Sequence, residues 1–181
     1  LSGGMITVRP GPSARFIADK NTIIGNTVLY GATSGMLLAN GQAGERLCVR
    51  NSGATAVVEG CGSNGCEYMT GGRVVILGPT GENFGAGMTG GMAFIYDPDN
   101  RFLENVNPET LEIRRVNQGH WQEQLHELVS RHARETDSAL AKQLLNNWAC
   151  EVNRFWHVVP TEVLEILPYP IAEAELSSQI A

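Results

Sequence analysis

Two stretches of the chain have the glycine spacing GxGxxG, which in dinucleotide-binding proteins forms a loop around a pyrophosphate. That loop requires a helix directly after it, so that the helix N-terminus faces the phosphates. Both stretches run instead into a Gly-Gly pair and an apolar run typical of a strand, and the sequence has no Gly-Lys pair for a Walker A loop. We therefore favour structural corners over cofactor loops. The glycines are Gly60, Gly62 and Gly65 in the first stretch and Gly85, Gly87 and Gly90 in the second.

Cysteine thiols are the next candidates, as metal ligands, nucleophiles or disulfide partners. Cys61 and Cys66 have the spacing CxxxxC, but a metal site would need further soft ligands nearby, and the other cysteines and histidines form no matching cluster. Four scattered cysteines are also too few for a disulfide framework. We expect reduced, structural thiols and no metal site. The residues weighed are Cys48, Cys61, Cys66 and Cys150, with His120, His126, His132 and His157.

Three of the histidines and five charged residues complete the candidates. His120, His126 and His132 are six residues apart. Because six residues turn about 600° on a helix, His126 points away from the other two, and we expect solvated or interface histidines. The charged residues lie in or beside expected strands, where such side chains are usually paired or on the outer face; contact with a neighbouring domain is the alternative. They are Glu45, Arg46, Arg50, Glu59 and Glu67.

These residues form no Ser/His/Asp arrangement and no catalytic pair of carboxylates. We therefore expect no catalytic, cofactor-binding or metal-binding residue in this chain. The net charge of −6 argues against a nucleic-acid or membrane partner. No apolar run approaches the roughly 18–20 residues that span a bilayer and no secretory signal opens the chain, so we expect a cytoplasmic protein.

The elements that position these residues change in character near residue 100. Of the 21 glycines among 181 residues, 20 lie in residues 1–100 and one, Gly119, lies beyond. An apolar fraction of 43% with 18% charged residues is sufficient for a folded core. Because the chain opens at Leu1 in the middle of a repeated phrase, we expect it to be a piece of a longer polypeptide.

The glycine-rich part contains a repeat. MTGG followed by an apolar run occurs at 69–72 and again 19 residues later at 88–91, and LSGGMITV at 1–8 is a weaker copy. Apolar runs bounded by glycines recur at half that offset, which predicts two strands per coil, and about four to five stacked coils over residues 1–97 can bury a common core. We predict a mainly β fold, a parallel β-solenoid with Val57, Val75, Ile76 and Phe94 in its core; an antiparallel barrel or sandwich is the alternative. The run centres are near Leu29, Leu38, Cys48, Val57, Glu67, Val75, Gly85 and Phe94.

Residues 98–181 have helical spacing and are predicted to cover the solenoid, as part of one structural unit. The helices should pack over the last coil or along one face, with Trp148 and Phe155 as anchors, and Leu144→Ala should then cost about 2–5 kcal/mol. Asp137 or Ser138 is the expected N-cap of the second helix. After Pro160 we expect a short turn or helix and then an extended segment. The two apolar stripes are Trp121, Leu125, Leu128 and His132, and Leu140, Leu144, Trp148, Val152 and Phe155.

Three phrases carry a family resemblance: residues 25–97 as a whole, SALAKQLLNNW at 138–148 and FWHVVPTEV at 155–163. They resemble the C-terminal GXGXG domain of the glutamate synthase large (alpha) subunit. The resemblance implies a right-handed β-helix that is not catalytic. It would pack against the glutaminase domain and the FMN-binding synthase domain and help to hold them for ammonia transfer. One departure is visible, since Asn64 stands where the family phrase HGCEYMTGG has His.

The resemblance also implies a parent enzyme, a glutamate synthase that makes two glutamates from glutamine and 2-oxoglutarate with NADPH as reductant. FMN and a 3Fe-4S cluster would lie in other parts of the large subunit, and FAD and NADPH on the small subunit. The amino-terminal cysteine nucleophile, the FMN barrel and the cluster cysteines of the family have no counterpart here, so no catalytic residue is carried over.

Two rival functions stay open at this point. One is the related β-helical subunit of formylmethanofuran dehydrogenase, against which the helical part of the chain argues. The other is a β-helical polysaccharide lyase or esterase, which would want charged residues clustered along one groove. Hexapeptide acyltransferases do not fit the 19-residue offset. An exposed strand edge at Leu1 could also support self-association of the chain.

Overall fold

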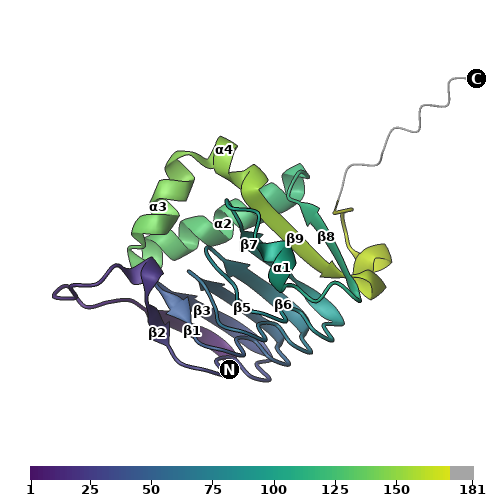
Figure 1. Ribbon diagram of the computed structural model, residues 1–181, viewed down its shortest axis with the longest axis horizontal. Coiled ribbons are helices and arrows are strands. Elements are labelled where there is room, and N and C mark those ends of the chain that lie inside the picture. Colours follow the sequence, from purple (N-terminus) through teal and green to yellow (C-terminus); the bar gives the residue numbers. More distant parts are fainter. Residues whose placement is uncertain (172–181) are drawn as a thin grey trace, which may run out of the picture.

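Five parallel strands recur along the chain and form the main sheet of the protein (Figure 1), here a computed structural model that describes residues 1–171. Leu38 lies opposite Val57, Val57 opposite Val75, and Val75 opposite Phe94, so partners are 18 or 19 residues apart. This confirms the predicted β-solenoid with coils of about 19 residues. The strands are β1 (Ser2–Val8), β3 (Ser34–Ala39), β5 (Ser52–Val58), β6 (Thr70–Ile76) and β7 (Gly90–Tyr96).

The second apolar run of each coil forms turns rather than the predicted second strand. Leu29, Cys48 and Cys66 have φ angles of 61°, 59° and 56°, and positive φ recurs at every second residue, which an extended strand does not allow. Backbone bonds still join the coils, as from Cys48 N to Val28 O at 2.9 Å and from Cys66 N to Leu47 O at 2.8 Å. The left-handed conformation costs roughly 1–2 kcal/mol for each such residue, which these bonds and the burial of the side chains offset. Outside the main sheet, β2 (Thr22–Ile24) and β4 (Gln42–Ala43) form a short parallel pair, and single bridges join Cys61 to Thr80 and Phe84 to Val106.

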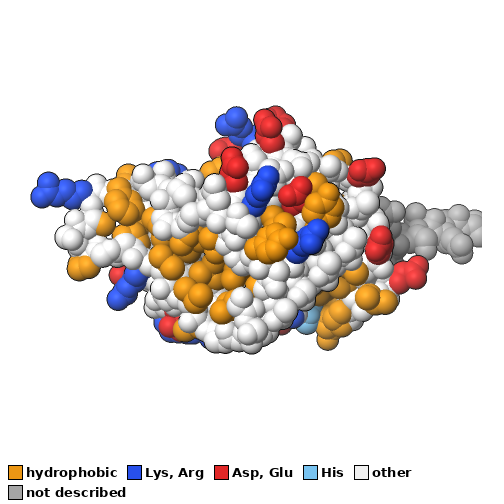
Figure 2. All heavy atoms as spheres, turned by 90° about the horizontal axis from the view of Figure 1, so that it is seen from below, with side chains coloured by type: hydrophobic (Ala, Val, Ile, Leu, Met, Phe, Trp, Pro, Cys, Tyr) orange, Lys and Arg blue, Asp and Glu red, His pale blue; other side chains and the backbone are white. Residues whose placement is uncertain are grey.

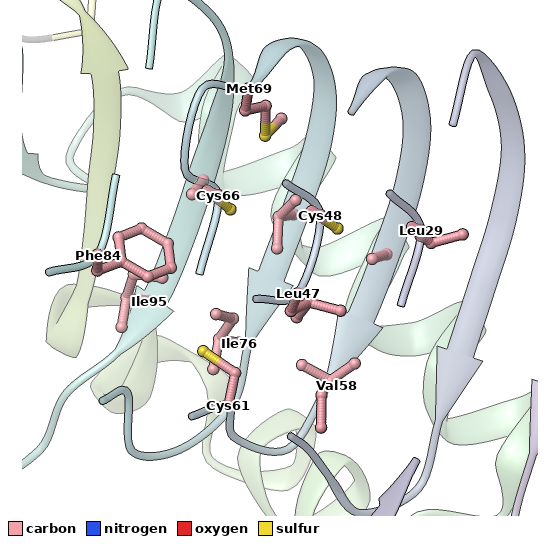
Figure 3. Packing of buried hydrophobic residues seen from close by; sticks show 14 of the residues in the cluster. Leu29, Leu47, Cys48, Val58, Cys61, Cys66, Met69, Ile76, Phe84 and Ile95 are labelled. Carbon is pink, nitrogen blue, oxygen red and sulfur yellow. The ribbon is translucent and has the colours of Figure 1, made fainter. Parts of the chain in front are cut away.

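The main sheet buries both of its faces. Side chains alternate along a strand, so Val58, Ile76 and Ile95 point into the solenoid toward the turns, as Figure 3 shows. Val57, Val75 and Phe94 point the other way, toward the helices. All four residues predicted for the core are fully buried. Of these, Ile76 alone lies inside the coils, and the other three join the solenoid to its cover.

The repeated MTGG phrase has a packing cause. Met69 and Met88 are fully buried. A Cβ on Gly71 would lie 2.2 Å from Ser52 O of the preceding coil, and one on Gly90 would lie 2.1 Å from Thr70 O. Each coil therefore approaches its neighbour so closely at this point that a side chain has no room.

The helical part covers one face of the sheet and is confirmed in outline. The long helix α2 (Gly119–Thr136) contacts β1, β3, β5 and β6, and the whole predicted stripe from Trp121 to His132 is buried. The second helix is shorter than predicted, because α3 (Ala139–Asn146) ends at Asn147. Ser138 caps α3, its Oγ accepting from Ala141 N at 3.0 Å, whereas Asp137 ends α2 in a left-handed conformation. The remaining helical turns are η1 (Ala18–Lys20), α1 (Phe102–Asn105), α4 (Trp148–Glu151), η2 (Val152–Arg154) and η3 (Thr161–Ile166).

Two antiparallel strands, not helices, cover the edge of the last coil. β9 (Phe155–Pro160) pairs with β7, and β8 (Leu111–Arg115) pairs with β9. Phe155 is fully buried as an anchor, but from a strand rather than from the predicted helix. After Pro160 the expected short helix is η3, and the expectation for residues 172–181 lies outside the described residues.

At the other edge, β1 pairs only with β3 among residues 1–171. Met5 and Ile6 on β1 are each 46% exposed. Seen from below, hydrophobic side chains gather in the left half of Figure 2, where Figure 1 places the N-terminal coil. No helix within residues 1–171 is long and apolar enough to cross a membrane.

The burial of Leu144 agrees with the prediction that Leu144→Ala destabilises the protein. Leu144 is 2% exposed and packs with Ala141 and Val152 in the layer between the sheet and the helices. Leu144→Ala is expected to lower the free energy of unfolding by about 2–5 kcal/mol, measured by chemical denaturation. The control is Gln143→Ala on the exposed side of the same helix, which should change stability by less than about 0.5 kcal/mol. Equal effects of the two changes would contradict the packing.

Candidate functional site

Five of the GxGxxG glycines lie in turns between coils, as expected, whereas Gly90 is the first residue of β7. No helix follows either stretch, and β6 and β7 come next in the chain. A Cβ on Gly62 would lie 2.9 Å from Glu45 N, and one on Gly65 would lie 2.9 Å from the ring of Phe84. A side chain at either glycine would therefore collide with the neighbouring coil.

Three of the four cysteines lie inside the solenoid (Figure 3). Cys48, Cys61 and Cys66 are buried, Cys150 is exposed, and all four are free thiols. Burial raises the pKa of Cys61 to about 12 and that of Cys48 further still. Since the thiolate is the nucleophile and the metal ligand, these thiols stay protonated and structural at neutral pH. No group of three or more Cys, His, Asp or Glu side chains in residues 1–171 is arranged to hold a metal ion.

The four histidines lie in different environments. His126 is exposed, and His120 is half-buried and stacks on Tyr169. His132 is fully buried at the interface between α2 and the solenoid. His157, to which the sequence assigned no role, is also fully buried. The histidines therefore form no common site.

A buried glutamate joins the solenoid to the helical cover. Glu59 follows β5 and is 1% exposed. Its Oε1 lies 3.3 Å from His132 Nε2, which donates in the tautomer that carries its proton there, and it also accepts from Ser138 Oγ. Around this cluster, Asn40 Nδ2 donates to Thr136 O at 3.1 Å. These polar contacts fix the turn between α2 and α3 against the coils.

Glu59 is the buried member of the five charged residues singled out in the sequence. Glu45, Arg46 and Arg50 are exposed on the turns, and Glu67 is half-buried. This matches the expectation of paired or outer-face charges. What the sequence did not indicate is the pairing itself, although one signal was present: Glu59 lies two residues after the outward-facing Val57 and so faces the helices.

A cleft of about 460 Å³ lies beside this cluster, at the carboxyl ends of β5, β6 and β7 and between α1 and α3. Glu59, Leu77, Ile95, Phe102 and Leu140 are among its lining residues. Five carboxylates line it, those of Asp19, Glu59, Asp97, Asp99 and Glu104, against the two basic side chains of Lys20 and Arg101. Such a surface has the chemistry to bind a cationic group.

Asp97 is the most firmly held of these carboxylates. It accepts from Arg101 N at 2.9 Å, from Phe102 N at 3.1 Å and from Trp156 Nε1 at 2.8 Å. All three donors are neutral, while the Arg115 guanidinium, stacked on the Trp156 ring, acts on the Asp97 charge through space. The beginning of α1 is thereby fixed at the wall of the cleft.

Comparison with known proteins decides the family. The family model of the GXGXG motif matches residues 1–161. The chain belongs to the GXGXG family. It is 59% identical over 94% of its length to the large chain of NADPH glutamate synthase from Azospirillum brasilense, and 49% identical over 88% to ferredoxin-dependent glutamate synthase 2 from Synechocystis. It is also 44% identical over 99% of its length to NADH glutamate synthase from Schizosaccharomyces pombe.

The comparisons confirm the resemblance drawn from the three phrases: this is a GXGXG domain of the glutamate synthase type. The chain covers only 11%, 10% and 8% of the length of these three relatives. At the corner that departs from the expected family phrase, Asn64 has a φ of 61° and its Oδ1 accepts from Asn83 Nδ2 at 2.9 Å. Asparagine adopts this left-handed conformation readily, which agrees with a structural corner in this GXGXG domain.

Ser138 is expected to matter for the stability of the GXGXG domain through two contacts at once. Ser138→Ala removes the cap of α3 and a donor to the buried Glu59, so the free energy of unfolding should fall by about 1–2 kcal/mol. Ser130→Ala, at a half-buried serine of α2, is the matched control and should stay within about 0.5 kcal/mol of the wild type. Denaturant titrations of both variants test this, and equal losses would contradict the role of Ser138.

Proposed function

We propose that this GXGXG domain is a non-catalytic structural part of a glutamate synthase. It positions the glutaminase domain and the FMN-binding synthase domain for ammonia transfer, as glutamate is made from glutamine and 2-oxoglutarate. The observation that supports this most directly is the continuous stack of coils. Five parallel strands and the turns opposite them are hydrogen-bonded from coil to coil around a buried core. Such a stack resists bending, which suits a spacer between two active sites.

The relatives support a role that does not depend on the electron donor. Their printed names include an NADPH enzyme, ferredoxin-dependent enzymes and an NADH enzyme, and all share this domain at 44–59% identity. A domain that chose the reductant would be expected to differ most between these enzymes. We propose that the small subunit of the parent enzyme binds FAD and NADPH and selects NADPH as the reductant.

The residues of this domain do not fit the other cofactors of the proposed parent. At Gly62 and Gly65 the neighbouring coil lies against the glycine, which argues against a loop around the phosphate of FMN at these corners. The interior thiols of Cys48, Cys61 and Cys66 have raised pKa values, which suits neither metal binding nor nucleophilic attack. We propose that FMN and the 3Fe-4S cluster are held by other parts of the large subunit, and that the enzyme is cytoplasmic.

The test is the coupling of the two reactions in the full-length polypeptide that contains this domain. Arg46→Glu combined with Arg50→Glu reverses two exposed charges on one turn of the solenoid. Glutamine hydrolysis should continue while the glutamate formed for each glutamine hydrolysed falls. Arg134→Glu, an exposed residue of α2, makes the same kind of charge change on the helical cover and should leave coupling intact.

Two results would overturn the proposal. The first is unchanged coupling when the whole exposed face of the solenoid has been substituted in this way. The second is turnover by the 181-residue chain alone, or a stoichiometric flavin or iron chromophore bound to it. Unchanged coupling would mean that the domain has no part in positioning. Turnover or a bound chromophore would mean that the domain has chemistry of its own.

A further inference from the structure

The cleft beside Glu59 has five carboxylates in its lining against two basic side chains. Lys20 pairs with Asp19 at 2.9 Å, which leaves Arg101 as the other basic residue of the lining. Within residues 1–171, Asp97, Asp99 and Glu104 take part in no ion pair. The carboxylates without an ion pair are therefore concentrated at one place, the wall formed by the start of α1, and outnumber the basic residues there, Arg101 in the lining and Arg115 near Asp97.

A second observation at the same cleft points to a missing donor. Glu59 is 1% exposed, and its Oε2 has no hydrogen-bond partner among the described residues, while Oε1 has two. Burying a carboxyl oxygen without a hydrogen-bond partner is costly. A donor that enters the cleft would remove that cost, and a cationic donor would also offset the carboxylates of the rim.

The lining suits a long basic side chain. Leu77, Ile95 and Phe102 give the cleft apolar walls beside its carboxylates. The side chains of Lys and Arg pack their methylene stems on apolar surface and keep the charged head among polar groups. A volume of about 460 Å³ lies within the range of roughly 300–1,000 Å³ typical of binding clefts.

We propose that this cleft is a docking site for a Lys or Arg side chain from another segment of the same glutamate synthase polypeptide. The inference rests on the proposed function, since a domain that positions others must hold them at defined contacts. The inference goes beyond the proposed function in two ways: it names the surface that makes one of those contacts, and it gives the charge of the partner side chain. Asp99 and Glu104 at the rim would attract the partner, and the apolar walls would fix its side chain.

Hydrogen exchange in the full-length polypeptide tests the contact directly. Asp99→Lys combined with Glu104→Lys reverses two exposed rim charges. If a basic side chain docks here, exchange over residues 97–105 should become roughly tenfold faster in this variant. Raising the KCl concentration to about 0.5 M should speed the same amides in the wild type, because salt screens the attraction.

Glu123→Lys combined with Glu127→Lys is the matched control, with the same charge change at two exposed positions of α2. It should leave exchange over residues 97–105 at the wild-type rate. A milder variant, Asp99→Asn with Glu104→Gln, checks that any loss of protection follows charge and not the bulk of lysine. Unchanged exchange in both cleft variants and at high salt would overturn the docking site.

The exchange and coupling measurements separate the two proposals. If the cleft variants alter exchange but no solenoid variant alters coupling, the docking site stands and the positioning role fails. If the Arg46 and Arg50 changes uncouple the reactions while exchange at the cleft never responds, the positioning role stands and the docking site is wrong.

Discussion

Replacing Gly90 with alanine is expected to lower the free energy of unfolding by more than about 4 kcal/mol, enough to prevent folding of many domains of this size. The cause is local and steric. The added Cβ would lie 2.1 Å from Thr70 O of the coil below, where β6 and β7 pair in parallel. The Cβ is fixed directly to the backbone of β7 and the oxygen belongs to the backbone of β6, so neither atom can move aside without breaking the ladder between the two coils.

Gly119→Ala provides the control for Gly90→Ala. A Cβ at Gly119, the first residue of α2, meets nothing within 4 Å. Alanine should be neutral there or stabilise the protein by up to about 1 kcal/mol, because it restricts the unfolded chain. Soluble yield and urea denaturation of the two variants measure the difference. Two folded proteins of similar stability would show that the coils have more freedom at Gly90 than their spacing indicates.

The same contact explains why the coil could be predicted from the sequence. A close backbone approach that recurs once per coil requires glycine at a fixed interval, and the interior beside it requires an apolar residue. The glycines that follow Met69 and Met88 meet the first requirement, and the two buried methionines meet the second. The spacing of the strands could therefore be predicted from the residue types alone. The residue types do not predict which face of the sheet meets the helices, because Val57 and Val58 are equally apolar and equally buried.

The turns opposite the sheet could not be predicted in the same way. Leu29, Cys48 and Cys66 adopt a left-handed conformation that their side chains disfavour locally. Their apolar character predicts strands. The turn forms instead because neighbouring coils stack on one another. β9 is a comparable case, because Phe155 continues a helical stripe in the sequence while the open edge of β7 pairs it as a strand.

The candidate site depends on contacts that are distant in the sequence. Glu59 meets His132 and Ser138, which are 73 and 79 residues away. Neither the spacing of the histidines nor the position of the glutamate indicates this pairing, since it follows from the docking of α2 and α3 on the sheet. The cleft likewise combines residues from η1, the strand ends, α1 and α3.

Acid is expected to destabilise this domain through one buried histidine. His157 on β9 is fully buried and stacks on Phe94 with ring centroids 4.5 Å apart, and neither ring nitrogen has a partner among the described residues. Burial lowers the pKa of His157 from 6.5 to about 3. The folded domain therefore keeps this imidazole neutral at pH values where an unfolded chain would protonate it.

The sign of the effect follows from proton binding. Below pH 6.5 the unfolded chain binds one more proton at His157 than the folded domain does, so stability falls as the pH is lowered and is unaffected above that value. The slope is about 1.4 kcal/mol per pH unit, and the full loss by pH 3 is on the order of 4 kcal/mol.

His157→Phe keeps an aromatic ring against Phe94 and Trp121 but has nothing to protonate. The difference in unfolding free energy between this variant and the wild type should grow in favour of the variant as the pH falls from 6.5 toward 3, which cancels the contribution of the carboxylates common to both proteins. His126→Phe, at an exposed histidine of α2, should follow the wild-type profile. Parallel profiles for His157→Phe and the wild type would mean that the buried imidazole is protonated in the folded domain, with a hydrogen-bond partner that the described residues do not supply.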